Sequence, residues 1–72
     1  SILFNQSYDA GLEIAEELNY APYMILHNKA LEDMVKALPK NMTEMGQVYG
    51  MGQKKLLMFG RRFLDAIKAF NP

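Results

Sequence analysis

The amino-acid sequence predicts an all-α domain, a compact bundle of four to five short helices, and three observations support this. Apolar residues recur at spacings of three and four along most of the chain, which is the period of an amphipathic helix. No segment alternates between apolar and polar residues in the manner of a strand. Proline, glycine and asparagine stand between the periodic segments, where helices usually begin and end.

The first predicted helix covers residues 3–19, with apolar and small residues on one side and acidic residues on the other. Ser7, Gly11 and Ala15 are spaced four apart along the apolar side. A glycine inside a helix costs about 1 kcal/mol relative to alanine. We interpret the three small residues as a groove that lets a neighbouring helix approach, so Gly11 should lie at a close contact.

Pro22 ends the first helix, because a proline disfavours helical geometry in the residue before it. Residues 22–26 then form a short apolar connector with room for one helical turn. Asn28 is predicted to be the N-cap of a second helix over residues 29–38, which Pro39 ends.

Two further helices are predicted after Pro39. Asn41, with Glu44 three residues later, resembles a capping box for a short helix over residues 42–48. The last helix, over residues 53–69, has an apolar arc of about 180°. The core is expected to contain Leu31, Leu56, Phe63 and Ile67.

The bulk composition indicates one domain without covalent staples. The chain has 72 residues, no cysteine and one histidine, so neither a disulfide nor a metal site of thiolates and imidazoles is expected. No run approaches the length of a membrane span. Because the chain starts at Ser1 without an initiator methionine, we interpret residues 1–72 as a single domain excised from a larger protein, monomeric in isolation.

Catalytic motifs are missing from the sequence. It contains neither of the glycine-rich nucleotide-binding patterns, and its acidic pairs Glu16-Glu17 and Glu32-Asp33 are adjacent on helices. Adjacent helical residues point about 100° apart, so neither pair is placed to share a proton or a metal ion. His27 is expected to be a surface or capping residue. We therefore predict no catalytic residue, no metal and no cofactor.

Charge is distributed unevenly although the formal net charge is zero. Residues 1–36 hold six acidic and two basic residues, whereas residues 37–72 hold two acidic and six basic residues. The two halves cancel in the sum, so a basic face remains compatible with the neutral chain.

The segment after the third helix is the strongest candidate for a binding site. Its two glycines allow a tight turn with exposed backbone N–H groups, and the following helix start would favour an anion such as phosphate. The alternative is an ordinary corner between two helices. The candidate residues in this helix-hairpin-helix-like turn are Gly50, Met51, Gly52, Gln53, Lys54 and Lys55.

Tyr23 and two arginines extend the candidate site. Tyr23 follows a proline in the connector, where its ring would either stack on a nucleobase or pack at the edge of the core. Arg61 and Arg62 lie two helical turns after Lys54 and Lys55 in a regular helix, so the four cations would form a stripe. Such a stripe is either a track for phosphates or a solvated face.

In their order along the chain, these motifs resemble the HRDC domain, and most closely that of bacterial RecQ helicases. The spacing agrees without gaps from about Leu3 to Ile67. The segments that carry the resemblance are Ile14-Ala15-Glu16-Glu17, Ala21-Pro22-Tyr23-Met24-Ile25-Leu26, Asn28, Leu31, Pro39, Glu44-Met45, Gly50-Met51-Gly52, Lys55-Leu56, Phe59-Gly60 and Phe63-Leu64.

The resemblance implies a five-helix globule and an accessory role in a bacterial, cytoplasmic, nucleoid-associated helicase of DNA repair and recombination. Family members bind single-stranded or partly single-stranded DNA weakly and help the parent enzyme choose its substrate. RNase D carries the same domain, so RNA binding is an alternative. The first helix is acidic where bacterial relatives are basic, so a contact surface for proteins, such as other domains of the helicase, is a second alternative.

Overall fold

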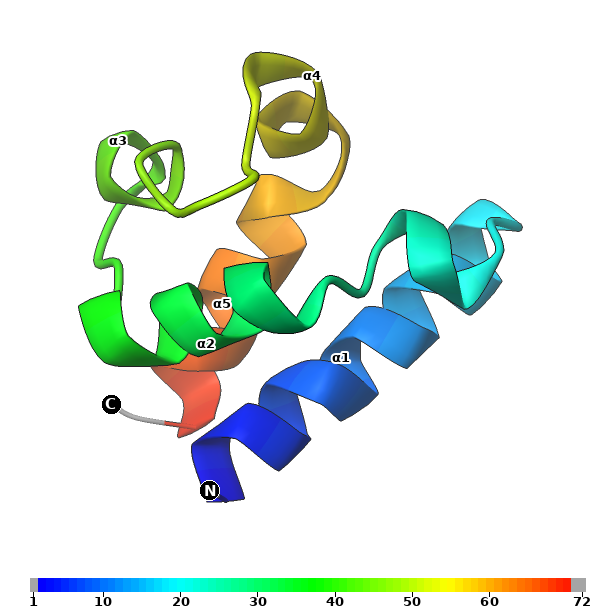
Figure 1. The fold of residues 1–72 in the computed structure, drawn as a ribbon, viewed down its shortest axis with the longest axis horizontal. Helices are drawn as coiled ribbons and strands as arrows, with labels where there is room; N and C mark the ends of the chain where they lie inside the picture. Colours follow the sequence, from blue (N-terminus) through cyan, green and yellow to red (C-terminus); the bar gives the residue numbers. More distant parts are fainter. Residues whose placement is uncertain (1, 71–72) are drawn as a thin grey trace.

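The computed structural model describes residues 2–70 of the chain (Figure 1). These residues contain helices and turns and no strand, which confirms the predicted all-α class. The elements in order are α1 (Ile2–Leu18), the 3₁₀ turn η1 (Pro22–Met24), α2 (Asn28–Ala37), α3 (Met42–Met45), α4 (Gln53–Lys55), the π-helical segment η2 (Leu56–Gly60) and α5 (Arg61–Phe70).

The first and last helices of the described residues, α1 and α5, lie against each other in the bundle. α1 packs against both α5 and α2, and α3 packs against η2 and α5. In Figure 1, α1 rises from the bottom of the view to its right-hand side, and α3 and α4 lie at the upper end. The turn between α3 and α4, which carries most of the candidate binding residues, therefore lies away from the start of α1.

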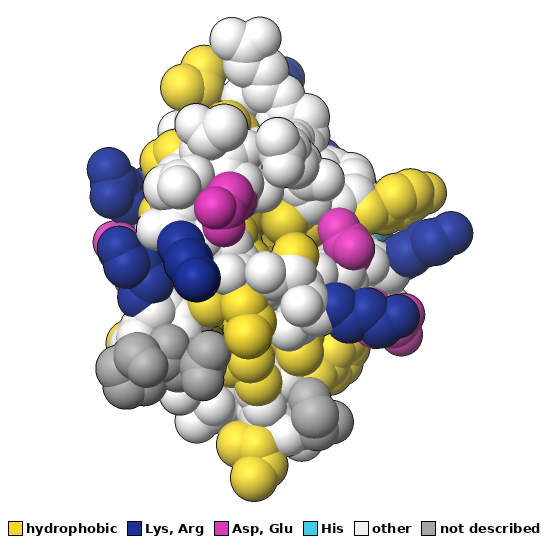
Figure 2. All heavy atoms as spheres, turned by 90° about the vertical axis from the view of Figure 1, so that its left-hand side faces the viewer, with side chains coloured by type: hydrophobic (Ala, Val, Ile, Leu, Met, Phe, Trp, Pro, Cys, Tyr) yellow, Lys and Arg dark blue, Asp and Glu magenta, His cyan; other side chains and the backbone are white. Residues whose placement is uncertain are grey.

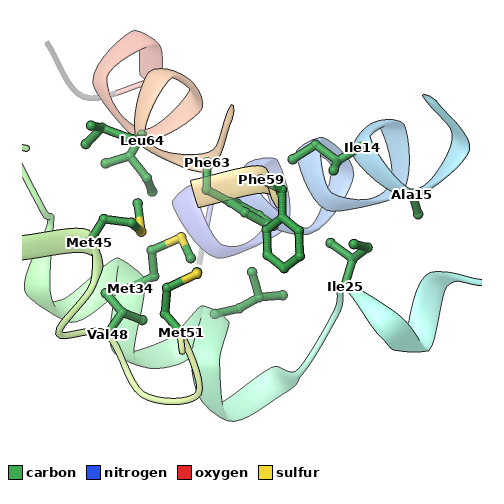
Figure 3. Packing of buried hydrophobic residues seen from close by; sticks show 12 residues of the cluster. Ile14, Ala15, Ile25, Met34, Met45, Val48, Met51, Phe59, Phe63 and Leu64 are labelled. Carbon is green, nitrogen blue, oxygen red and sulfur yellow. The ribbon is translucent and has the colours of Figure 1, made fainter. Parts of the chain in front are cut away.

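The core draws residues from α1, α2, α3, α5 and the connecting segments (Figure 3). Leu31, Phe63 and Ile67 are buried in it and Leu56 is half-buried against it, so the predicted core is confirmed. The rings of Phe59 and Phe63 meet edge to face, with their centroids 5.8 Å apart and their planes at 70°. Aromatic pairs in this geometry add stability beyond the area that they bury.

Gly11 lies at a close contact, as its place among small residues predicted. A Cβ atom added there would be 2.2 Å from Leu26 Cδ2 and 3.3 Å from Phe63 Cζ. The missing side chain thus lets the connector before α2 and a core ring of α5 approach the backbone of α1.

The second helix begins one residue earlier than predicted. His27 has extended backbone angles and is the N-cap, and its carbonyl accepts the N–H of Leu31 at 2.9 Å. Asn28 is thus the first helical residue, and the prediction that it is the N-cap is wrong. The side chain of His27 makes no capping hydrogen bond, so the helix begins without a side-chain cap. The helix ends at Ala37, and Leu38 follows in the left-handed conformation with φ 48°.

The predicted capping box is present at the start of α3. Asn41 Oδ1 accepts the N–H of Glu44 at 2.9 Å, and Glu44 Oε1 accepts the N–H of Lys40 at 3.0 Å. The return bond thus reaches the residue before the N-cap. The helix ends at Met45 instead of spanning residues 42–48, because the chain continues in tighter turns whose N–H groups bond three residues back.

The last helix is not one regular α-helix over residues 53–69. It runs from Gln53 to Phe70, but the five residues of η2 between α4 and α5 are π-helical. Leu56 folds over Gly60 there, since a Cβ at Gly60 would be 2.7 Å from Leu56 Cδ1. A π turn holds about one residue more than an α turn, so it rotates α4 by roughly 100° relative to its place on a regular helix.

Candidate nucleic-acid interface

The turn between α3 and α4 is held by its apolar residues. Val48 and Met51 are buried, and the N–H of Met51 donates to the carbonyl of Val48 at 3.0 Å. Gly50 between them has φ +75°, a conformation that favours glycine. Gly52, the N-cap of α4, and Gln53 are exposed. The buried pair thus anchors a turn whose backbone faces solvent on both sides of Met51.

Tyr23 lies on the surface, and the alternative of a core-edge residue does not hold. The residue is 74% exposed in η1, whereas Ile25, two residues later, is buried in the core. The hydrogen bonds from the N–H groups of Ile25 and Leu26 to the carbonyl of Pro22, at 3.0 and 2.8 Å, fix the turn. The connector therefore holds an aromatic ring in solvent on a backbone that is itself anchored.

Three of the four predicted cations form no ion pair with any acid among residues 2–70. Lys54 and Arg61 are exposed and Lys55 is half-buried. Because η2 interrupts the helix, Lys54 and Lys55 do not align with the arginines as a regular helix would place them. Lys54 and Lys55 lie in α4, directly after the turn, and Arg61 is the first residue of α5.

Arg62 is bound to an acid of the first helix. Both of its terminal nitrogens donate to the carboxylate of Glu17 near the end of α1, the Nη2–Oε1 distance being 3.0 Å. The hydrogen bonds from Arg62 hold the pKa of Glu17 below its usual value, and those to Glu17 raise the pKa of Arg62. A predicted phosphate ligand is therefore occupied by the protein's own carboxylate.

The structure adds a groove that the sequence did not predict. It has a volume of about 570 Å³ and lies between the start of α2 and the turn. Its polar lining includes Lys29 and Lys55, which are 26 residues apart in the sequence. The lining residues are Leu26, His27, Asn28, Lys29, Ala30, Tyr49, Gly50 and Lys55.

Tyr49 closes one side of this groove. The residue is 56% exposed, and Lys29 Nζ lies 4.9 Å from the ring centroid. The backbone N–H of Tyr49 donates to Asp33 Oδ2 at 2.9 Å, which ties the turn to α2. No local pattern could have revealed this, because the partners lie on different elements and the fold alone brings them together.

The charges do not form one basic field over the face that Figure 2 shows. Lysine and arginine side chains stand toward its edges, acidic side chains lie between them, and apolar side chains run down its middle. Within residues 2–70 no group of three or more histidines, cysteines or carboxylates could hold a metal ion. No helix in that range has the length and hydropathy of a membrane span.

Comparison with known proteins gives matches over most of the chain. A family model for the HRDC domain matches residues 10–67. The ATP-dependent DNA helicase RecQ of Haemophilus influenzae is 34% identical over 56 residues, which are 78% of this chain and 9% of the helicase. The ATP-dependent DNA helicase RecQ of Bacillus subtilis is 33% identical over 68 residues, or 94% and 12% of the two chains. The chain thus spans a small part of each relative, and no solved structure gives a significant match.

Proposed function

The chain belongs to the HRDC domain family, and from this premise we propose that it is the nucleic-acid-binding accessory domain of a RecQ-like DNA helicase. In this proposal it binds single-stranded or partly single-stranded DNA and helps the helicase choose its substrate at the chromosome. The observation that carries the proposal is the pair Lys54 and Lys55, which follow an exposed glycine turn and have no acidic partner among residues 2–70.

Two further features support binding to a single strand. The first N–H groups of a helix have no partner within it, so those that follow Gly52 are available to a phosphate oxygen. Tyr23 offers a ring for a base, and stacking on an aromatic side chain contributes about 1–3 kcal/mol per base. Stacking requires an unpaired base, which favours single strands over duplex.

The affinity should be low. The chain is neutral overall, α1 is acidic, and Arg62 is neutralised by Glu17. Few phosphates can therefore be contacted, and we expect a dissociation constant no tighter than about micromolar at physiological salt, in the range of non-specific binding. A domain with this affinity for DNA would bias the substrate choice of an enzyme whose catalytic residues lie elsewhere.

The test is a titration of labelled single-stranded DNA with the wild type, Lys54→Ala/Lys55→Ala and Tyr23→Ala. The lysine variant should bind more weakly and with a salt dependence reduced by about 1 per lost phosphate contact. The tyrosine variant should bind more weakly with a nearly unchanged salt slope, because a stacked base releases no counterion. Lys40→Ala/Lys68→Ala is the matched control, since it removes two exposed lysines that are not among the candidate binding residues.

The outcomes separate this proposal from its alternatives. Absence of binding by the wild type at low salt would exclude it, as would equal binding by all variants. A clear preference for RNA of the same sequence would favour a nuclease of the RNase D type as the parent.

A protein-contact surface is the second candidate, and α1 is the observation that favours it. Leu12 and Tyr8, each 38% exposed, stand beside the exposed acids Asp9, Glu13 and Glu16 on its outer side. Exposed apolar residues rimmed by charge are typical of contact sites, and this one would suit a basic partner. If the wild type binds no nucleic acid, this surface becomes the leading candidate.

A further inference from the structure

Tyr49 is exposed although its position is fixed by the residues around it. Val48 before it and Met51 after it are buried, and its own N–H is bound to the carboxylate of Asp33. The anchored backbone thus directs an aromatic ring toward solvent.

The groove beside the ring has the charge that a phosphate requires. Lys29 and Lys55 reach it from two different elements, and neither pairs with an acid among residues 2–70. Lys29 is held near the ring by a cation–π contact at 4.9 Å. At an exposed site this contact is weaker than the stacking of a base, so a nucleotide can displace the ammonium from the ring and bind it through the phosphate.

We propose that Tyr49 is a second stacking residue for single-stranded DNA, and that Lys29 and Lys55 bind the phosphate of the stacked nucleotide. This inference rests on the proposed function and extends it from one aromatic contact, at Tyr23, to two. A strand held at two rings must have two unpaired bases available, so the second contact would strengthen the preference for single strands over duplex.

Fluorescence provides a direct test, because the chain contains no tryptophan. Tyr49→Trp places a single indole at the proposed site, where a stacked base should quench its emission as a short oligothymidylate is added. Tyr8→Trp is the matched control, since Tyr8 is also a partly exposed tyrosine but lies on α1. We expect saturable quenching in the first variant and none in the second. Equal or absent quenching in both, under conditions where the wild type binds the oligonucleotide, would overturn the proposal.

Affinity measurements test the roles of the ring and the lysine separately. Tyr49→Ala should weaken binding about tenfold, within the range that loss of one base stack produces, and Tyr49→Phe should bind like the wild type. Lys29→Gln should weaken binding and lower the salt slope by about 1. Unchanged affinity for DNA in a folded Tyr49→Ala variant would show that the ring takes no part in binding and only packs beside α2. If that variant fails to fold, the quenching of Tyr49→Trp decides alone.

The proposed function and this inference fail in different ways. If the wild type binds no single-stranded DNA at low salt, both are wrong. If the wild type binds and Tyr23→Ala binds more weakly, while Tyr49→Ala and Lys29→Gln bind normally, the proposed function stands and the second contact is wrong.

Discussion

Gly11 is the position where the packing of this domain can be tested most sharply. In an exposed helix, replacing glycine by alanine stabilises by about 1 kcal/mol, because alanine loses less backbone entropy. Here the added methyl group would lie 2.2 Å from Leu26 Cδ2 and 3.3 Å from Phe63 Cζ. Helix propensity and packing therefore act in opposite directions, and the structure decides which is larger.

The geometry predicts that packing prevails. Contact at 2.2 Å cannot persist, so the end of the half-buried Leu26 side chain must shift, and Leu26 Cγ and the buried ring of Phe63, each 3.3 Å from the added carbon, must also give way. Overpacking costs about 1–3 kcal/mol, and most of this range exceeds the gain of about 1 kcal/mol in propensity. We expect Gly11→Ala to destabilise by about 1 kcal/mol and Gly11→Leu by about 3 kcal/mol. In a domain of this size each kcal/mol lowers the melting temperature by about 4–8 °C.

Thermal and urea unfolding followed by circular dichroism measure these values, and Leu26→Ala supplies the decisive background. In the Leu26→Ala background, the effect of Gly11→Ala on the free energy of unfolding should change sign, and the substitution should stabilise the domain. Only the gain in helix propensity and the milder contact with Phe63 then remain. Glu16→Leu on the exposed side of α1 is the control for adding a leucine to this helix. Stabilisation by Gly11→Ala in the wild-type background would refute the close contact.

Two further predictions concern polar groups of α1. The hydroxyl of Ser7 is buried without a hydrogen-bond partner, so Ser7→Ala should raise the free energy of unfolding by about 1 kcal/mol; a lower melting temperature in circular dichroism would contradict this. Because the hydrogen bonds from Arg62 lower the pKa of Glu17, this carboxylate should stabilise the fold at neutral pH, an effect that is lost as the pH falls through its lowered pKa. On acidification, the free energy of unfolding should therefore fall more in the wild type than in Glu17→Gln. The difference should be small because the pair is exposed. If the free energy of unfolding depends on pH in the same way in both proteins, the pair contributes nothing.

The ion pair between Glu17 and Arg62 also bears on function. It joins the acidic half of the sequence to the basic half, and it pairs with a carboxylate a cation that the sequence pattern had assigned to DNA. Within the candidate interface, the cations that have no acidic partner among residues 2–70 are instead Lys29, Lys54, Lys55 and Arg61. Only Lys29 among them was outside the predicted set, and it reaches the interface from α2.

Local signals were sufficient for much of the domain. Helical periodicity predicted the all-α class and the residues of the core, and the capping box at Asn41 predicted the start of α3. The small-residue spacing around Gly11 predicted a close contact. The order of the motifs predicted the family. These features depend on residues within a few positions of each other or on the solvent preference of a helix face, so sequence spacing alone carries them.

Other features were decided only when the helices packed together. The π turn in η2 breaks the regular spacing of the cations. Arg62 forms an ion pair with Glu17, 45 residues earlier in the chain, and Lys29 forms a cation–π contact with Tyr49. Each depends on how far one helix is rotated and displaced against another. That relation is set by the filling of a shared core, to which residues distant in the sequence contribute together. Sequence by itself thus determined which helix faces are apolar and which are charged, and tertiary structure determined which residues of those faces meet.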